Sequence, residues 1–254
     1  MNHLNLSAIL TALLAFILGV LALARAPRNK SAQIFACYSL SIALWSSCFA
    51  QLHRISDPSW AIWYGRLLHL GCTFIPAFFF HFAVSLSGEY ERRKTLVIAA
   101  YALAATYNAL NLFPGIFTAE IMHRVGYAYP RPIGLLYFSY FLFFAALVSY
   151  GLRMLWKLAP HLSGHHAKKL LLFLLATSFG YLGGLNNFLI MIDVQLFPLF
   201  PYGLYAVALY GVVGSILAGK SFFTVSARPG LSRLVERPGV GETTSVSSRE
   251  AVHA

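Results

Sequence analysis

Seven long apolar stretches occupy nearly the whole chain up to Lys220, and each is bounded by turn-forming, aromatic or charged residues. An α-helix rises about 1.5 Å per residue, so about 20 apolar residues cross a hydrocarbon core about 30 Å thick. Each stretch is therefore long enough to form a membrane-spanning helix. The predicted spans are Ser7–Ala24, Ile34–Leu52, Ala61–Leu86, Thr95–Phe113, Leu135–Leu155, Leu170–Ile192 and Pro201–Gly219.

The pattern within the stretches favours helices over membrane strands. Backbone groups in hydrocarbon must be paired, which leaves helices or a closed barrel. The continuous apolar run Leu170–Leu175 lacks the alternation of a barrel strand. Composition agrees, since 11% of residues are charged against about 25% in soluble domains, and the mean hydropathy is +0.67. The sequence predicts an all-α polytopic membrane protein with a seven-helix transmembrane bundle.

Basic residues concentrate in alternate loops of this predicted bundle. Of the 19 Lys and Arg residues, 15 fall on one side of the membrane, three fall on the other and Arg66 lies within a span. The sparse side holds Arg54, Arg124 and Arg131. Because loops rich in Lys and Arg stay in the cytoplasm, we expect the N-terminus outside and the C-terminus in the cytoplasm. The net charge of +11 then reflects topology and contact with anionic lipids, and we expect no nucleic-acid partner.

The composition changes after Lys220, which divides the chain into two parts. Residues 1–220 form the predicted seven-helix domain, and residues 221–254 form a flexible basic and polar cytoplasmic tail without an apolar period. The tail is too short for a further catalytic domain. The longest outer loop, Pro114–Ile133, is rich in tyrosine and proline and is predicted to lie across the mouth of the bundle, either as a lid or as an interfacial anchor.

Small residues spaced four apart predict close helix packing. Gly180 and Gly184 form one such pair, and Gly211 and Ser215 form another. Such pairs let helix backbones approach closely in lipid, either within the bundle or in a homodimer.

Polar residues inside the spans are costly in lipid and therefore informative. Arg66, His69 and Thr73 share one face of the third span by their spacing. Three spans bring polar side chains to the same depth below the outer surface. We expect either an outward-open cavity that binds a small ligand, with Arg66 pairing an anion, or hydrogen bonding between helices without a ligand. The candidate ligand-binding residues are Arg66, His69, Asn108, Asn111, Asn186 and Asn187. In the alternative, Asp193 at the end of the sixth span takes the place of the anion as a built-in counter-ion of Arg66.

Recognisable catalytic templates are missing from the sequence. It contains no nucleophile elbow, P-loop, HExxH motif or intramembrane carboxylate pair, so we expect no enzyme activity and no cofactor. Cys37, Cys48 and Cys72 lie within apolar spans without CxxC spacing, which favours packing roles over a metal site. His81 is expected to bond to a neighbouring helix.

Three segments carry a resemblance to a known family. Asn29–Trp45 leads from a basic loop into Phe35–Ser41, and Pro76 is followed by Phe79–Phe82. The third segment runs from Lys168 through Gly183–Leu189 to Pro201. In this order and spacing, over most of residues 5–220, they resemble the seven-helix N-terminal sensor region of bacterial histidine kinases.

That resemblance implies a sensory module of the bacterial cytoplasmic (inner) membrane, which detects a ligand or a membrane state and relays a helix movement to a cytoplasmic partner. No phospho-acceptor histidine box or ATP-binding glycine box follows Lys220, so we expect no kinase activity from the chain itself. Two other classes remain open on the residues alone. A small-solute transporter would need a polar path to both faces, and a structural membrane subunit would use its asparagines only to join helices.

Overall fold

The computed structural model describes residues 3–124, 127–162 and 164–191, together with Tyr205, Val207 and Leu209. Side chains are not described at positions 3, 4, 124, 127, 186, 187, 190 and 191. The predicted seventh span, apart from those three residues, and the predicted tail therefore lie outside the described part of the chain.

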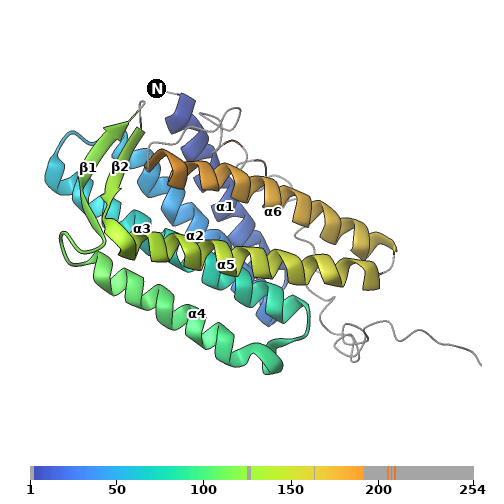
Figure 1. Cartoon of the computed structure of the whole chain (residues 1–254). Coiled ribbons are helices and arrows are strands. Elements are labelled where there is room, and N and C mark those ends of the chain that lie inside the picture. Colours follow the sequence, from blue (N-terminus) through green and yellow to red (C-terminus); the bar gives the residue numbers. More distant parts are fainter. Residues whose placement is uncertain are drawn as a thin grey trace, which may run out of the picture.

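Six long helices and one β-hairpin make up the described chain (Figure 1). The first four predicted spans correspond to α1, α2, α3 and α4, and the next two correspond to α5 and α6. The elements are α1 (His3–Arg25), α2 (Lys30–Leu52), α3 (Pro58–Leu86), α4 (Tyr90–Asn111), β1 (Thr118–Arg124), β2 (Tyr127–Pro132), α5 (Gly134–Leu158), the short 3-10 helix η1 (Ala159–His161) and α6 (Gly164–Met191).

All six helices begin before the predicted apolar spans, and in α2 and α3 the added first turn is capped by a side chain. Asn29 accepts a hydrogen bond from the backbone N of Ala32 at 3.1 Å and starts α2. Asp57 accepts from the backbone N of Ser59 at 2.8 Å and starts α3, with Pro58 in the first turn. Such caps satisfy N–H groups that have no partner inside the helix. A prediction based on apolar stretches alone does not include these polar first turns.

Five described helical segments are long and apolar enough to cross a membrane. They lie in α1, α2, α3, in α5 with η1, and in α6. α4 is not among them, because Glu91, Arg92, Arg93 and Lys94 occupy its first turns and lower its mean hydropathy. The chain is thus an integral multi-pass membrane protein, while seven crossings and the orientation of the termini stay predictions.

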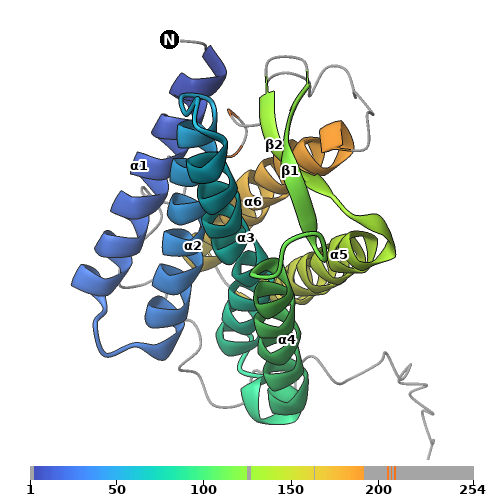
Figure 2. The ribbon, with the colours of Figure 1, turned by 90° about the vertical axis from the view of Figure 1, so that its left-hand side faces the viewer.

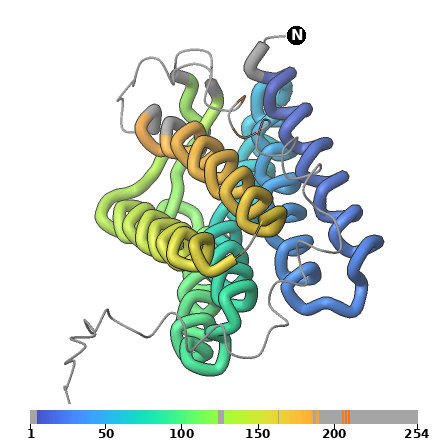
Figure 3. The backbone as a smooth tube through the Cα atoms, turned by 90° about the vertical axis from the view of Figure 1, so that its right-hand side faces the viewer, coloured from blue at the N-terminus to red at the C-terminus, as the bar shows by residue number. Residues whose placement is uncertain are grey.

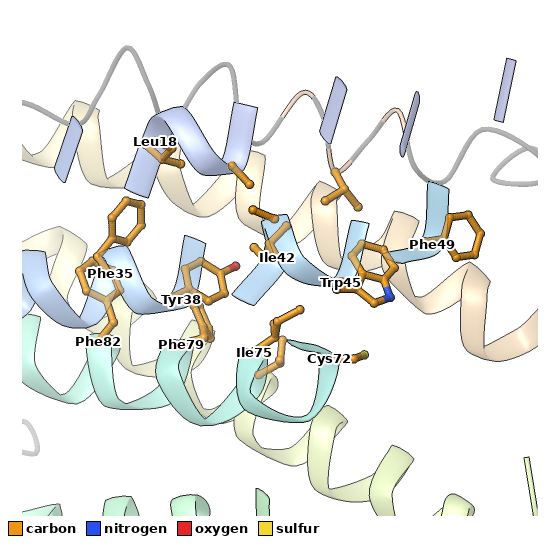
Figure 4. Packing of buried hydrophobic residues seen from close by; sticks show 14 of the residues in the cluster. Leu18, Phe35, Tyr38, Ile42, Trp45, Phe49, Cys72, Ile75, Phe79 and Phe82 are labelled. Carbon is orange, nitrogen blue, oxygen red and sulfur yellow. The ribbon is translucent and has the colours of Figure 1, made fainter. Parts of the chain in front are cut away.

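α3 is the central helix of the described bundle, since it packs against α2, α4 and α5 (Figure 2). α2 approaches α3 at Gly71, where an added Cβ would lie 2.8 Å from the carbonyl O of Ser41 and from the backbone N of Trp45. α1 packs against α2 at one side of the bundle, and α5 lies at the other side (Figure 3). Between α2 and α3, Tyr38 and Phe79 pack with ring centroids 5.5 Å apart (Figure 4).

The predicted outer loop contains a β-hairpin, which corrects the purely helical prediction. β1 and β2 pair antiparallel, with Arg124 opposite Tyr127 and a register shift between Thr118 and Ile121. β2 contacts α2, α3 and α6, and the hairpin lies at the same end of the bundle as the N-terminus (Figure 2). The prediction that this segment lies across the end of the bundle is confirmed. Local pairing of the two arms was not apparent from a sequence interrupted by proline.

Candidate functional site

The polar face of α3 is turned toward the hairpin, α4 and α5. His69 is buried, with 1% of its surface exposed. Its Nδ1 lies 2.9 Å from the carbonyl O of Gly65, and its Nε2 lies 3.4 Å from the hydroxyl of Tyr137 on α5. Because a carbonyl only accepts, Nδ1 carries the proton and Nε2 accepts from Tyr137. Both ring nitrogens of His69 are therefore engaged.

Two asparagines join α4 to α3. The amide N of Asn108 donates to the hydroxyl of Thr73 and to the carbonyl O of Ala104, the latter at 3.2 Å. The amide N of Asn111 donates to the carbonyl O of Arg66 at 3.1 Å. The described geometry therefore has the hydrogen bonding between helices that one of the two sequence hypotheses expected. Such bonds align α4 with α3 although α4 is the least apolar of the long helices.

A groove of about 340 Å³ opens between α3, the hairpin and the segment that joins α4 to β1. We call it the hairpin groove; its lining includes Arg66, Asn111, Thr118 and Glu120. The guanidinium carbon of Arg66 lies 4.9 Å from the ring centroid of Trp63, a cation–π distance. No carboxylate of the described residues pairs with Arg66.

The acid in the hairpin groove is already paired across the hairpin. Glu120 Oε1 lies 2.7 Å from Nε of Arg131. Nη2 of Arg131 donates a second hydrogen bond to Glu120 Oε2 at 3.2 Å. A hydrogen bond from its own backbone and the bonds from Arg131 lower the pKa of Glu120. Glu120 therefore remains ionised and paired with Arg131, which leaves Arg66 as the free cation among the described groove residues.

A second hollow lies deeper in the bundle, between α2, α3, α5 and α6 and beneath β2. We call it the aromatic cavity; its volume is about 70 Å³. On the α2 and α3 walls, Tyr38, Ile42 and Trp45 face Cys72 and Ile75 (Figure 4). The remaining described lining is mostly aromatic and includes Phe49, His69, Tyr129, Tyr137, Phe144, Thr177, Tyr181 and Phe188.

The structure divides the predicted site residues between these two hollows. Arg66 and Asn111 line the hairpin groove, His69 lines the aromatic cavity and Asn108 lines neither. Arg66 and His69 share a helix face, as their spacing predicted, but the ring of Phe117 packs edge-on against His69 at 5.3 Å. The structure therefore does not bring Arg66 and His69 into one hollow, and Phe117, just before β1, covers His69. The side chains of Asn186 and Asn187, and the whole of Asp193, lie outside the described structure.

Gly180 and Gly184 line the aromatic cavity, although their spacing predicted close helix packing. A Cβ added at Gly184 would meet no atom within 4 Å in the described part of the chain. Among the described residues, Gly184 therefore faces open space and makes no close helix contact. Gly211 and Ser215 lie outside the described residues. No sequence signal distinguishes a glycine that faces a cavity from one that faces a helix.

Two further histidines, His81 on α3 and His53 just after α2, have defined hydrogen-bond partners. The prediction that His81 bonds to a neighbouring helix is confirmed, since its Nδ1 lies 3.0 Å from the hydroxyl of Tyr101 on α4. His53, just after α2, places Nδ1 2.9 Å from the carbonyl O of Phe49. Burial lowers the pKa of His53, and the neighbouring His123 on β1 lowers it further. No group of three metal-ligating side chains occurs among residues that the structure describes.

Comparison with known proteins assigns the family. No curated protein matches the chain. The family model described as the N-terminal 7TM region of histidine kinase matches residues 7–223. That range contains every described element except the first turn of α1, and it carries both the hairpin groove and the aromatic cavity. The chain therefore belongs to the family of N-terminal seven-transmembrane regions of histidine kinases, the membrane sensory input modules of those proteins.

Proposed function

We propose that this module detects a small anionic ligand in the hairpin groove and relays the binding event to a cytoplasmic partner. The observation that carries the proposal is Arg66, a cation without an ion pair among the described residues, in a groove of about 340 Å³. Ligand pockets are typically about 300–1,000 Å³. A guanidinium with free donors binds carboxylates and phosphates with two hydrogen bonds.

The groove adjoins contacts through which binding changes the helix arrangement. Asn111 lines the groove and bonds to the backbone of Arg66 on α3, and its Oδ1 accepts from the hydroxyl of Thr118 at 3.4 Å. One turn further into the bundle, Asn108 bonds to Thr73. An anion that draws Arg66 from Trp63 therefore acts on α3, α4 and β1 together. A ligand shifts the population toward the helix arrangement that it binds more tightly.

The groove also bears on the competing hypothesis of a purely structural subunit. A subunit that uses its asparagines only to join helices needs no hollow beside Arg66. The hairpin groove lies at that position and has Arg66 and Asn111 in its lining. The sensory hypothesis accounts for both the hydrogen bonds and the groove.

The ligand site is tested with the full chain in lipid nanodiscs. A panel of small carboxylates and phosphates is screened for an increase in the thermal unfolding midpoint, and affinities are measured for those that stabilise. We expect Arg66→Ala to weaken binding about tenfold or more, since hydrogen bonds to charged groups are the stronger kind. Arg54→Ala is the matched control, because Arg54 is exposed, lies on the same predicted side of the membrane and does not line the groove. Equal affinity in wild type and Arg66→Ala would contradict the proposal.

The relay to a partner is tested at the C-terminus. Residues 221–254 lie outside the described structure and carry the predicted cytoplasmic tail. We expect immobilised full chain to retain a cytoplasmic signalling protein from a membrane-free extract, and a chain ending at residue 220 to lose it. Equal retention by both chains would argue against a role of the tail.

A further inference from the structure

The aromatic cavity has the chemistry of a second binding site, distinct from the hairpin groove. No described residue lines both hollows. We propose that the aromatic cavity binds a small, neutral, mainly apolar molecule that carries one hydroxyl, such as a short alcohol.

The hydroxyl of Thr177 indicates the polar part of this ligand. Thr177 lies on α6, lines the cavity and is 1% exposed. Its Oγ1 is buried and has no hydrogen-bond partner among the described residues. A buried hydroxyl without a partner is costly, and a ligand hydroxyl would satisfy it.

Other polar groups around the cavity, those of His69, Tyr137, Tyr140 and Cys72, are already engaged. His69 bonds to Gly65 and Tyr137 through its two ring nitrogens. The hydroxyl of Tyr140 donates to Sγ of Cys72 at 3.0 Å. A molecule with one hydroxyl and an apolar body matches a mostly aromatic wall in which the hydroxyl of Thr177 has no partner among the described residues.

The rest of the wall determines the charge and the size of the ligand. No Asp, Glu, Lys or Arg occurs among the described residues that line the cavity, so a charged ligand would be left without a counter-ion. The volume of about 70 Å³ is below the volume of about 150 Å³ of an apolar cavity known to bind benzene. Gly180 and Gly184 keep this space open on the α6 side.

The position of the cavity gives binding there a structural consequence. Its walls come from α2, α3, α5 and α6, and its roof includes Tyr129 of β2, whose ring lies 5.4 Å from that of Phe49. A molecule bound there therefore lies among four helices and the hairpin. Such a ligand stabilises one packing of these helices against one another.

Photolabelling of the full chain in nanodiscs tests the proposal. The probes are azibutanol, a short alcohol with a photoreactive diazirine, and the hydrocarbon diazirine that lacks its hydroxyl. Labelled residues are identified by mass spectrometry. We expect azibutanol to label the cavity wall, including Trp45 or Tyr181. Unlabelled butanol in excess should prevent that labelling.

Two variants separate the shape of the cavity from its hydroxyl. Gly184→Leu fills the space and is expected to abolish wall labelling by both probes. Thr177→Val keeps the side-chain shape and is expected to weaken labelling by azibutanol about fivefold, the effect of one hydrogen bond, and to leave the hydrocarbon probe unchanged. Thr106→Val is the matched control on the exposed face of α4, where the hydroxyl bonds to Ala102 of its own helix.

Wall labelling at the wild-type level in a folded Gly184→Leu chain would overturn the cavity as the site. Unchanged azibutanol labelling in Thr177→Val would overturn the assignment of an alcohol, and that variant is nearly isosteric, so it is expected to fold. Neither result bears on Arg66, whose role in the hairpin groove is tested by anion binding.

Discussion

At the scale of single residues, Asn108 and Asn111 are positioned as partners of α3. Both side-chain amides cross to the neighbouring helix, one to the hydroxyl of Thr73 and one to the carbonyl O of Arg66. Hydrogen bonds between membrane helices contribute about 0.6 kcal/mol on average and up to about 1.7 kcal/mol. These two bonds are therefore modest stabilisers that matter mainly for the alignment of α4.

The Asn108 bond gives the first prediction. We expect Asn108→Ala to lower the free energy of unfolding by about 0.6–1.7 kcal/mol, because it removes the donor to Thr73. Unfolding of the purified protein in mixed micelles by increasing SDS measures the change. Thr106→Ala serves as the control, since its hydroxyl bonds only within α4. Equal effects of the two substitutions would show that the bond between helices contributes nothing.

Sequence spacing placed Arg66, His69 and Thr73 on one helix face correctly, since a helix repeats every 3.6 residues. It could not predict that Phe117 packs against His69 and that the hairpin lies beside Arg66, because those contacts come from a segment about 50 residues further along the chain. Thr177 gave no signal either. A threonine in an apolar span usually bonds to its own backbone, and only the cavity sets this one apart.

At the scale of elements, close approach of α2 and α3 organises the bundle. Gly71 permits this approach, since a methyl group there would lie 2.8 Å from backbone atoms of α2. Gly151 plays a similar part on α5, where a Cβ would lie 2.9 Å from the ring of Phe79. Association in lipid depends on such packing because lipid is as apolar as the side chains.

The α2–α3 contact gives the second prediction. We expect Gly71→Ala to destabilise the protein by about 1–3 kcal/mol, because the added methyl group forces the two backbones apart. Gly184→Ala is the matched control, since its methyl group enters open space in the described structure. Both substitutions gain the same helix propensity, so the difference between their SDS unfolding free energies reports the contact. A difference of zero would remove the proposed role of Gly71.

The hairpin is the element that sequence analysis missed. Its aromatic residues suggested the membrane–water interface, yet Tyr129 is only 2% exposed and roofs the aromatic cavity. Pro130 of β2 packs against α3, where a Cβ on Gly65 would lie 3.0 Å from Cγ of that proline. Contact with three helices, and not local sequence preference, stabilises this pair of strands.

At the scale of the whole molecule, the open question is how the bundle lies in the membrane. The loops at Ala26–Asn29 and Ser87–Glu89 lie at the end of the bundle opposite the hairpin (Figure 2). Basic residues cluster near both loops, which predicts that this end faces the cytoplasm. Five described helical segments have the length and hydropathy to cross, and α4 lacks that hydropathy.

Cysteine labelling in intact cells gives the third prediction. We expect Gly115→Cys, beside the hairpin, to react with a membrane-impermeant maleimide, and Arg28→Cys to react only after the cells are lysed. The unsubstituted chain controls for its three native cysteines, of which Cys37 is exposed. Reaction of both variants in intact cells would mean that α2, α3 and α4, which lie between the two positions, do not cross the membrane three times as predicted. Reaction of Arg28→Cys alone would reverse the orientation.

The sequence by itself determined that the chain lies in a lipid bilayer, that the six described long segments are helices, and which family the chain belongs to. Each of these follows from local composition and spacing, because lipid demands long apolar segments with internally paired backbones. Tertiary structure alone decided that the polar residues divide between a groove and a cavity, that the outer segment pairs as strands, and that Gly184 faces space. These features depend on contacts between distant segments, and the periodicity of one helix carries no information about which neighbour packs against it.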